Sequence, residues 1–287
     1  MVAGSPLVVL SFRHGVFESI SLVITLPERL QARLSTPAGG QRYWEVDALR
    51  GVAILMMVLY HCLYDLAEFG GHDIRVRSGF WDGFADATAF LFIFLAGVSL
   101  SISYARMRGC QPSPSSGGFP KFARRGARIF AYGLLVSVAT WVVDPEHYVR
   151  FGVLHLIGAS IILAYPLLGR AVPAAVLGLV LVAAGVALEV VRYPLGYPWL
   201  LWVGFRPDHL PVFDYRPLLP WFGVVLLGVA LGQWLYPQAR RVVELPDLSR
   251  FAPITFLGLL GRRSLAIYLV HQPLLLGVLA LLGAIEL

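Results

Sequence analysis

Charged residues are scarce in this chain. Asp, Glu, Lys and Arg make up only 14% of its 287 residues, whereas 57% are hydrophobic; soluble domains carry about 25% charged residues. A chain this poor in charge cannot cover a water-facing surface with polar groups, so most of it must be solvated by lipid. The composition predicts an all-α, polytopic transmembrane helix bundle.

Lysine and cysteine are nearly absent as well. Lys121 is the only lysine, so the net charge of +6 comes from arginines that cluster between apolar runs. Basic residues in such places set topology and contact lipid headgroups, and we expect no nucleic-acid partner. The two cysteines, Cys62 and Cys110, fall in different environments. Their spacing provides neither a disulfide framework nor a zinc site, and no metal is expected.

The chain also lacks the short motifs of several common enzyme classes. It has no internal repeat, no P-loop, no GxGxxG after a strand and no HExxH. These absences argue against a P-loop or Rossmann nucleotide site and against a zinc protease.

What the chain does contain is a series of apolar runs near the length of about 20 residues that crosses a bilayer. We expect about seven spans, over 51–69, 84–104, 128–143, 151–169, 171–191, 217–236 and 264–285. The run 198–205 is too short to span and is expected to be re-entrant or interfacial. Residues 1–41 are expected to form a weakly structured or amphipathic extension, and 42–287 a single transmembrane domain.

The loops alternate in charge. Arginine-rich segments, 28–50, 105–128 and 237–253, alternate with acidic or mixed segments, 70–83, 144–149 and 192–216. Arginine-rich loops face the cytoplasm in membrane proteins. We therefore expect a cytoplasmic N-terminal region and an extracytoplasmic C-terminus.

Ionisable residues within the first span are the strongest functional signal. Arg50 and His61 are eleven residues apart, so they share a helix face at a separation of about 16 Å, which places His61 near mid-bilayer. Asp65 follows His61 by one turn and can accept a hydrogen bond from one ring nitrogen, leaving the other to act as a general base. The alternative is that these groups only bridge helices.

Other polar groups extend this candidate site. Asp82 and Asp86 begin the second span, where carboxylates can also serve as helix caps. His155 lies near the start of the fourth span, and His271 with Gln272 lies in the seventh. Each histidine could instead be an interhelical hydrogen-bond donor, and the second pair could repair the backbone opened by Pro273.

The two ends of the bundle differ in character. Arg50, with Arg124 and Arg125 of the basic cluster 121–128, makes the cytoplasmic mouth positive and suited to phosphates or a nucleotide. The opposite mouth combines aromatic rings such as Trp81 with carboxylates such as Asp82, which suits a hydroxyl-rich ligand such as a sugar. Aromatic residues at this depth are also ordinary interface anchors.

Five blocks, in order along the chain, carry a resemblance to a known family. They read RYWEVDALRGVAILMMVLYHCLYDL, FLFIFLAGVSLSISYAR, FGVLHLIGASIILAYPLL, PWFGVVLLGVALG and GRRSLAIYLVHQPLLL. Together, from about Arg42 to Leu276, they resemble the bacterial branch of the heparan-α-glucosaminide N-acetyltransferase catalytic-domain family. The spacing of Arg50 and His61, and the YLVHQP stretch, are also similar to motifs of the broader transmembrane acyltransferase superfamily.

The resemblance implies acyl transfer across a bacterial inner membrane. Acyl-CoA, typically acetyl-CoA, would donate from the cytoplasm to an amine or hydroxyl of an extracytoplasmic sugar or glycan. Arg50 would lie near the coenzyme phosphates, and Asp47 would hold Arg50 or a neighbouring backbone group. His61 would lie near the thioester, and His155 and His271 would line the same cavity.

The sequence departs from the lysosomal members at one position. Ser78, in SGFWDGF, stands where those enzymes have their catalytic histidine. The acid/base role therefore falls to His61 or, as an alternative, to His72 in the same loop. A bacterial envelope glycan is expected as acceptor in place of heparan sulfate, with His72, Trp81, Asp82 and Asp86 as its binding residues.

The expected function is thus a multi-pass membrane acyltransferase with acetyl-CoA as donor. Direct transfer and a route through an acyl-histidine both fit, and the chain could form a homo-oligomer. Two other classes stay open: a transporter or flippase for a glycan or lipid-linked precursor, which would use the same groups as a proton relay, and a non-catalytic assembly subunit.

Overall fold

The computed structural model describes residues 8–10, 22–24, 42–110, 118–190, 200–205 and 214–285. The chain divides into two units, Met1–Ala38 and Gly39–Leu287. In the first, strand β1 (Val8–Leu10) pairs antiparallel with β2 (Leu22–Ile24). The rest of the expected extension over 1–41 lies outside the described residues.

The second unit is helical throughout its described part. Its α-helices are α2 (Trp44–Glu68), α3 (Phe80–Cys110), α4 (Gly118–Val143), α5 (Val153–Leu163), α6 (Ala171–Val190), α7 (Leu218–Leu235), α8 (Ala252–Arg262) and α9 (Ser264–Leu281). Six of them, α2, α3, α4, α6, α7 and α9, are long and apolar enough to cross a membrane. The protein is therefore an integral membrane protein whose second unit is an all-α bundle, as its composition predicts.

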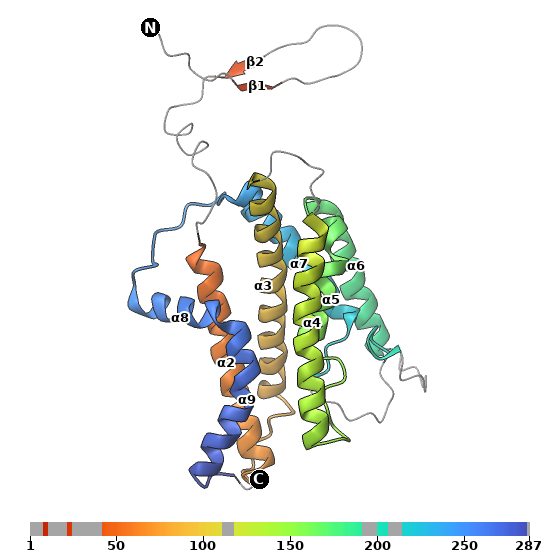
Figure 1. Ribbon diagram of the computed structural model, residues 1–287, viewed down its shortest axis with the longest axis vertical. Helices are drawn as coiled ribbons and strands as arrows, with labels where there is room; N and C mark the ends of the chain where they lie inside the picture. Colours follow the sequence, from red (N-terminus) through yellow and green to blue (C-terminus); the bar gives the residue numbers. More distant parts are fainter. Residues whose placement is uncertain are drawn as a thin grey trace. The chain divides into compact units, whose positions relative to one another are not determined.

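The expected span over 151–169 is shorter than a bilayer-crossing helix. It forms α5, of 11 residues, and then the 3-10 turn η1 (Tyr165–Leu167), where Pro166 interrupts the α-helix. The segment still runs along about the first half of α4. His155, near the start of α5, contacts Phe130 of α4, while Tyr165 contacts Phe119 at the start of α4. The returning chain lets α4 and α6 run in the same direction (Figure 1).

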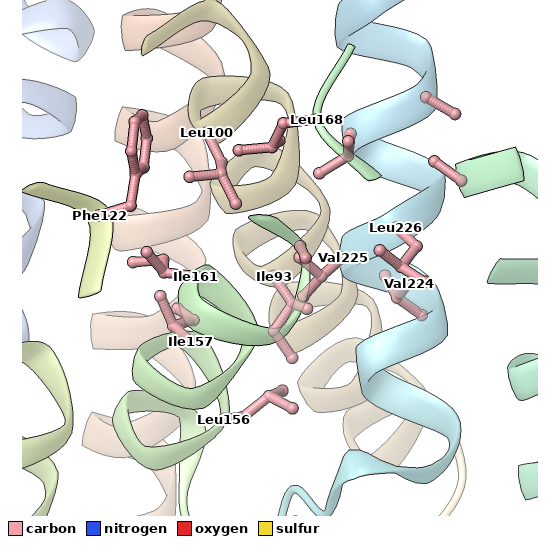
Figure 2. Packing of buried hydrophobic residues seen from close by; sticks show 14 of the residues in the cluster. Ile93, Leu100, Phe122, Leu156, Ile157, Ile161, Leu168, Val224, Val225 and Leu226 are labelled. Atoms are coloured by element: carbon pink, nitrogen blue, oxygen red, sulfur yellow. The ribbon is translucent and has the colours of Figure 1, made fainter. Parts of the chain in front are cut away.

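The apolar core lies where α3, α5 and α7 meet (Figure 2). Ile93 and Leu100 of α3, Leu156 of α5 and Leu226 of α7 are almost fully buried. A band of apolar side chains on α4 and α6 is exposed instead, as expected of helix faces that contact lipid.

Glycines allow close helix crossings in this unit. A side chain at Gly97 of α3 or Gly228 of α7 would collide with a backbone carbonyl of the other helix. The crossing of α2 and α8 is equally close, because a side chain at Gly51 or Gly261 would do the same. Small residues bring backbones into van der Waals contact, which drives helix association in lipid.

Helix α8 follows the 3-10 turn η3 (Pro237–Ala239) and comes from a stretch expected only as a loop and the approach to the last span. It packs on α2 near Arg50 and is followed directly by α9, which also packs on α2. As Figure 1 shows, α2 and α9 run side by side, and the C-terminal ends of both helices lie at the same end of the bundle. This pairing sets up the candidate site.

Candidate active site between α2 and α9

Two histidine rings meet where α2 packs on α9. The ring centroids of His61 and His271 are 4.8 Å apart, with the planes at 85°. Sequence analysis expected these histidines to line one cavity, and the structure brings them into direct contact. His271 is only 8% exposed, whereas His61 is half-buried.

Each histidine has its Nδ1 bound to a backbone carbonyl of its own helix. Nδ1 of His61 is 2.8 Å from the carbonyl oxygen of Met57, and Nδ1 of His271 is 2.7 Å from that of Tyr268. A carbonyl can only accept, so in the neutral rings both Nδ1 atoms carry the hydrogen and both Nε2 atoms carry a lone pair. Nε2 of His271 is buried and has no hydrogen-bond partner among the described residues. The geometry thus presents two imidazole bases at one place.

Asp65 is bound differently from what the sequence suggested. We expected it to accept from His61, but its Oδ1 accepts from Nε2 of Gln272 on α9, at 2.6 Å. The reason is geometric: the Met57 carbonyl one turn before His61 already takes its Nδ1 hydrogen, and α9 brings Gln272 beside the carboxylate. Asp65 is 0% exposed. Its Oδ2 and the Oε1 of Gln272 are buried without hydrogen-bond partners in the described ranges.

The ring pair lies closer to one end of the bundle than the sequence suggested. Since α2 begins at Trp44 and ends at Glu68, His61 is about 26 Å along the axis from its first residue and about 10 Å from its last. The mid-bilayer estimate placed the start of the membrane segment at Arg50, whereas the helix starts earlier. His61 is therefore nearer the end that faces loops 70–83 and 144–149.

That end of the bundle holds the candidate acceptor-binding residues. Asp86 on α3 is 60% exposed and pairs with Arg216, whose guanidinium stacks on Trp221 at 4.8 Å. Trp81 lies in a cluster with Phe80 and Phe84, with ring centroids 5.1 and 5.6 Å away.

His72 and Asp82 are exposed at the same end. Within the part of the chain that the structure describes, neither side chain makes a hydrogen bond or ion pair, although the backbone N–H of His72 donates to the carbonyl of Leu66 at 3.3 Å. Both remain candidates on the grounds of position alone.

Asp214 connects this end to α9. Its Oδ2 accepts from the hydroxyl of Tyr268 at 2.8 Å and from the backbone N–H of Val153 at 3.3 Å. The backbone N–H of Arg216 donates to the carbonyl of Phe151. The segment from Asp214 to Arg216 thereby ties the start of α5 to the helix that carries His271.

The opposite end of α2 is the positive mouth. Arg50 lies 3.8 Å from Asp47, as expected. Arg125 of α4 donates to the hydroxyl of Ser103 at 3.4 Å and lies within electrostatic range of Arg50. Arg124 is exposed on the same helix. Two guanidinium groups from different helices, with one carboxylate beside them, suit a phosphate group.

His155 does not join the ring pair. The N–H of Gly152 donates to its Nδ1 at 3.2 Å, and the Ser137 hydroxyl lies 3.5 Å from its Nε2. Its ring packs against Phe130 and Phe151. These contacts cap α5 and fasten it to α4, so the expectation that His155 lines the same cavity as His61 is not met.

The sequence analysis did not show how several residues of this site bond to one another, because their partners are far away in the chain. Gln272 was grouped with His271 among the polar residues of the last span, with repair of the backbone at Pro273 as the alternative, but its bond to Asp65 was not expected. Asp214, Arg216 and Tyr268 form bonds that no local pattern encodes. Within the described ranges, no group of three or more His, Cys, Asp and Glu side chains could hold a metal ion.

Comparison with known families now gives this arrangement a context. The sequence model of the family described as "Heparan-alpha-glucosaminide N-acetyltransferase, catalytic" matches residues 42–273. The chain belongs to this family. It is thus a transmembrane acetyltransferase by family, and the match runs from the residue before Tyr43 to the end of the His271–Pro273 stretch. Searches among curated proteins and solved structures returned no match.

Proposed function

We propose that this protein transfers an acetyl group from cytoplasmic acetyl-CoA to a sugar or glycan on the extracytoplasmic side of a bacterial inner membrane. The observation that carries the proposal is the pair of imidazoles at the α2–α9 contact, each with Nδ1 fixed to a backbone carbonyl. This arrangement leaves Nε2 of His61 able to accept a proton from an attacking acceptor.

The coenzyme would enter at the positive mouth. Arg50, held by Asp47, and Arg125 would bind its phosphates, with Arg124 at the rim. Arg50 lies about 16 Å along α2 from His61, a distance for the extended pantetheine arm to bridge. The thioester would then reach the ring pair while the nucleotide stays at the cytoplasmic end.

The acceptor would enter from the other end, past Trp81, Asp82, Asp86 and His72. Three buried atoms near the ring pair lack partners among the described residues: Oδ2 of Asp65, Oε1 of Gln272 and Nε2 of His271. With Asp65 ionised, all three are acceptors. A primary amine offers more hydrogens to them than a hydroxyl does. This count, and the glucosaminide in the family's name, support an amino sugar and N-acetylation.

Two residues of this chain, His61 and His271, act directly on the acceptor nitrogen. Nε2 of His61 takes a proton from the acceptor nitrogen, which then attacks the thioester carbonyl carbon. His271 accepts a second hydrogen bond from the same nitrogen and orients its lone pair. His271 is buried and His61 is half-buried in an apolar bundle, which limits the access of bulk water to the thioester and so slows its hydrolysis.

The test is an assay of the purified full chain in detergent with radiolabelled acetyl-CoA and glucosamine. Wild type should release CoA and label the sugar, and His61→Ala should lower the rate by about 10²–10⁴-fold, the usual contribution of a general base. His147→Ala, in the loop after α4, is the matched control and should keep wild-type activity. A folded wild type that neither binds nor turns over acetyl-CoA would overturn the proposal.

A transporter is the second candidate, because a fully buried Asp65 next to two histidines also fits a proton relay. The same assay separates the two. A transporter would leave acetyl-CoA intact and instead move a glycan precursor across a vesicle membrane in a His61-dependent manner.

A further inference from the structure

We infer that the proton taken by His61 leaves toward the extracytoplasmic side along α2, through Asp65 and then Glu68. The inference rests on the proposed acetyl transfer and adds a direction to it. The two carboxylates are relay residues, and the acetyl donor and the proton would use opposite ends of the bundle.

The three groups share one face of α2. His61, Asp65 and Glu68 are at positions i, i+4 and i+7, the spacing that stacks side chains along a helix. The two steps cover about 6 Å and about 4.5 Å of the axis, gaps that one water molecule can bridge. The last member stands in the last turn, since α2 ends at Glu68.

Toward the cytoplasmic end of α2, the helix offers no comparable path for a proton leaving His61. Toward the cytoplasmic end, the buried residues on α2 before His61 are Met57, Ile54 and Ala53, all apolar. The next ionisable group on the helix is Arg50, about 16 Å away. A cationic guanidinium does not accept a proton, and Asp47, which pairs with it, is about 21 Å along α2 from His61. The carboxylates of α2 that lie near His61 are therefore on one side of it.

Asp65 has one oxygen to spare. Its Oδ1 accepts from the Gln272 amide, which cannot itself take up a proton, while Oδ2 has no partner in the described part of the chain. A purely structural link between α2 and α9 would require only the first of these oxygens. The free Oδ2, on a side chain that is 0% exposed, is placed to receive a proton and pass it on.

Glu68 is the contact with water. Its side chain is 44% exposed and lies 3.0 Å from Arg77. Arg77 also donates to the hydroxyl of Tyr64, and this hydrogen bond, followed by the charge of Glu68, raises the pKa of Arg77. Glu68 thus pairs with a cation at the water-exposed end of α2, where a carboxylate can exchange protons with solvent.

The charged groups around this part of α2 are compatible with proton transfer from His61 to Asp65 and then to Glu68. Asp65 lies within electrostatic range of His61 and Tyr64. Tyr64 also faces Arg77 and Glu68, His61 faces His271, and Tyr60 faces Asp82, Arg77 and Arg216. Of the two cations, Arg77 pairs with Glu68 and Arg216 pairs with Asp86.

The reaction releases one proton when the acceptor is an ammonium. The ammonium gives its first proton to Nε2 of His61, and the nitrogen lone pair forms the C–N bond to the acetyl carbon. The C–S bond breaks, and the CoA thiolate takes the second proton from the same nitrogen. One acetyl-CoA and one ammonium thus yield one amide, one CoA thiol and the proton that His61 must discharge.

Proteoliposomes can locate that proton. The full chain is reconstituted into vesicles of phosphatidylethanolamine and phosphatidylglycerol that enclose glucosamine and a membrane-impermeant pH dye. Acetyl-CoA is then added outside, so only molecules with the coenzyme mouth outward react. One lumenal proton should appear per CoA released into the bath.

Substitutions at Asp65 test its role. Asp65→Asn keeps an acceptor for Gln272 but cannot carry a proton, and it should slow CoA release about tenfold or more. Asp65→Ala should be slow as well, and formate, a small acid able to enter the vacated space, should restore its rate. A merely structural role would give no rescue. Asp73→Asn, an exposed carboxylate in the following loop, should match wild type.

The outcomes of these experiments distinguish a failure of the proton relay from a failure of the proposed acetyltransferase activity. CoA release accompanied by protons in the bath, or by none, would overturn the relay and leave the acetyltransferase standing. Full activity in Asp65→Asn, or a slow Asp65→Ala that formate does not rescue, would also overturn it. If wild type releases no CoA, the proposed acetyl transfer itself is contradicted, and with it the relay that depends on it.

Discussion

At the scale of single residues, His61 and His271 use the same local arrangement. A helical side chain points back toward the preceding turn, and in both residues Nδ1 meets a carbonyl there. The helix itself therefore selects the tautomer and leaves Nε2 as the basic atom. Neither histidine needs a carboxylate partner for this, and Asp65 is free to bind Gln272 instead.

The two histidines should nonetheless differ in function. His271→Ala removes a hydrogen bond to the acceptor and leaves the base His61 in place. We expect the KM for glucosamine to rise roughly five- to tenfold, the factor for a hydrogen bond of about 1–1.4 kcal/mol. The KM for acetyl-CoA should not change.

Initial-rate kinetics with each substrate varied in turn would check this. A variant in which kcat falls as far as in His61→Ala, at an unchanged KM for glucosamine, would show that His271 shares the proton-transfer step and does not simply orient the acceptor.

At the scale of helices, the crossing of α2 and α8 supports the positive mouth. A Cβ at Gly261 would overlap the backbone carbonyl of Asp47, the residue that pairs with Arg50. The crossing therefore connects helix packing to the position of the group proposed to bind phosphate. By contrast, a Cβ at Gly277 of α9 would meet no described atom within 4 Å.

These two glycines give a matched pair of substitutions. Gly261→Ala should destabilise the protein by about 1–3 kcal/mol because the backbones must separate, and it should weaken acetyl-CoA binding. Gly277→Ala should stabilise it by up to about 1 kcal/mol, since alanine is the better helix former. Thermal unfolding in detergent would measure both effects. Equal shifts for the two variants would contradict the close crossing.

At the scale of the whole molecule, the ends of the helical unit differ in charge and in proposed role. Arg50 and Arg125 are at one end, and the Asp86–Arg216 pair and the aromatic cluster around Trp81 are at the other. Acetyl transfer across a membrane requires this polarity, since donor and acceptor come from opposite sides.

Orientation can be read by labelling. In a background of Cys62→Ser and Cys110→Ser, we expect Glu146→Cys to react with an impermeant maleimide in intact cells. Ser249→Cys should react only after the membrane is permeabilised, because arginine-rich loops face the cytoplasm. The reverse pattern would place the positive mouth outside and exclude cytoplasmic acetyl-CoA as donor.

The sequence by itself determined the class of this protein. Its scarcity of charge fixed lipid as the solvent, and the helical period placed His61 and Asp65 on one face of α2. The family that the five ordered blocks resemble is confirmed, at the level of the family, by the match over 42–273.

Only the tertiary structure decided which groups bond to one another. Helical periodicity tells which residues share a face, but the face of another helix that meets it depends on how the whole bundle packs. The pairing of α2 with α9 brings His271 to His61 and Gln272 to Asp65. In the same way, packing makes His155 a cap for α5, because its ring nitrogens meet groups of α4 and of the loop before α5, away from the ring pair.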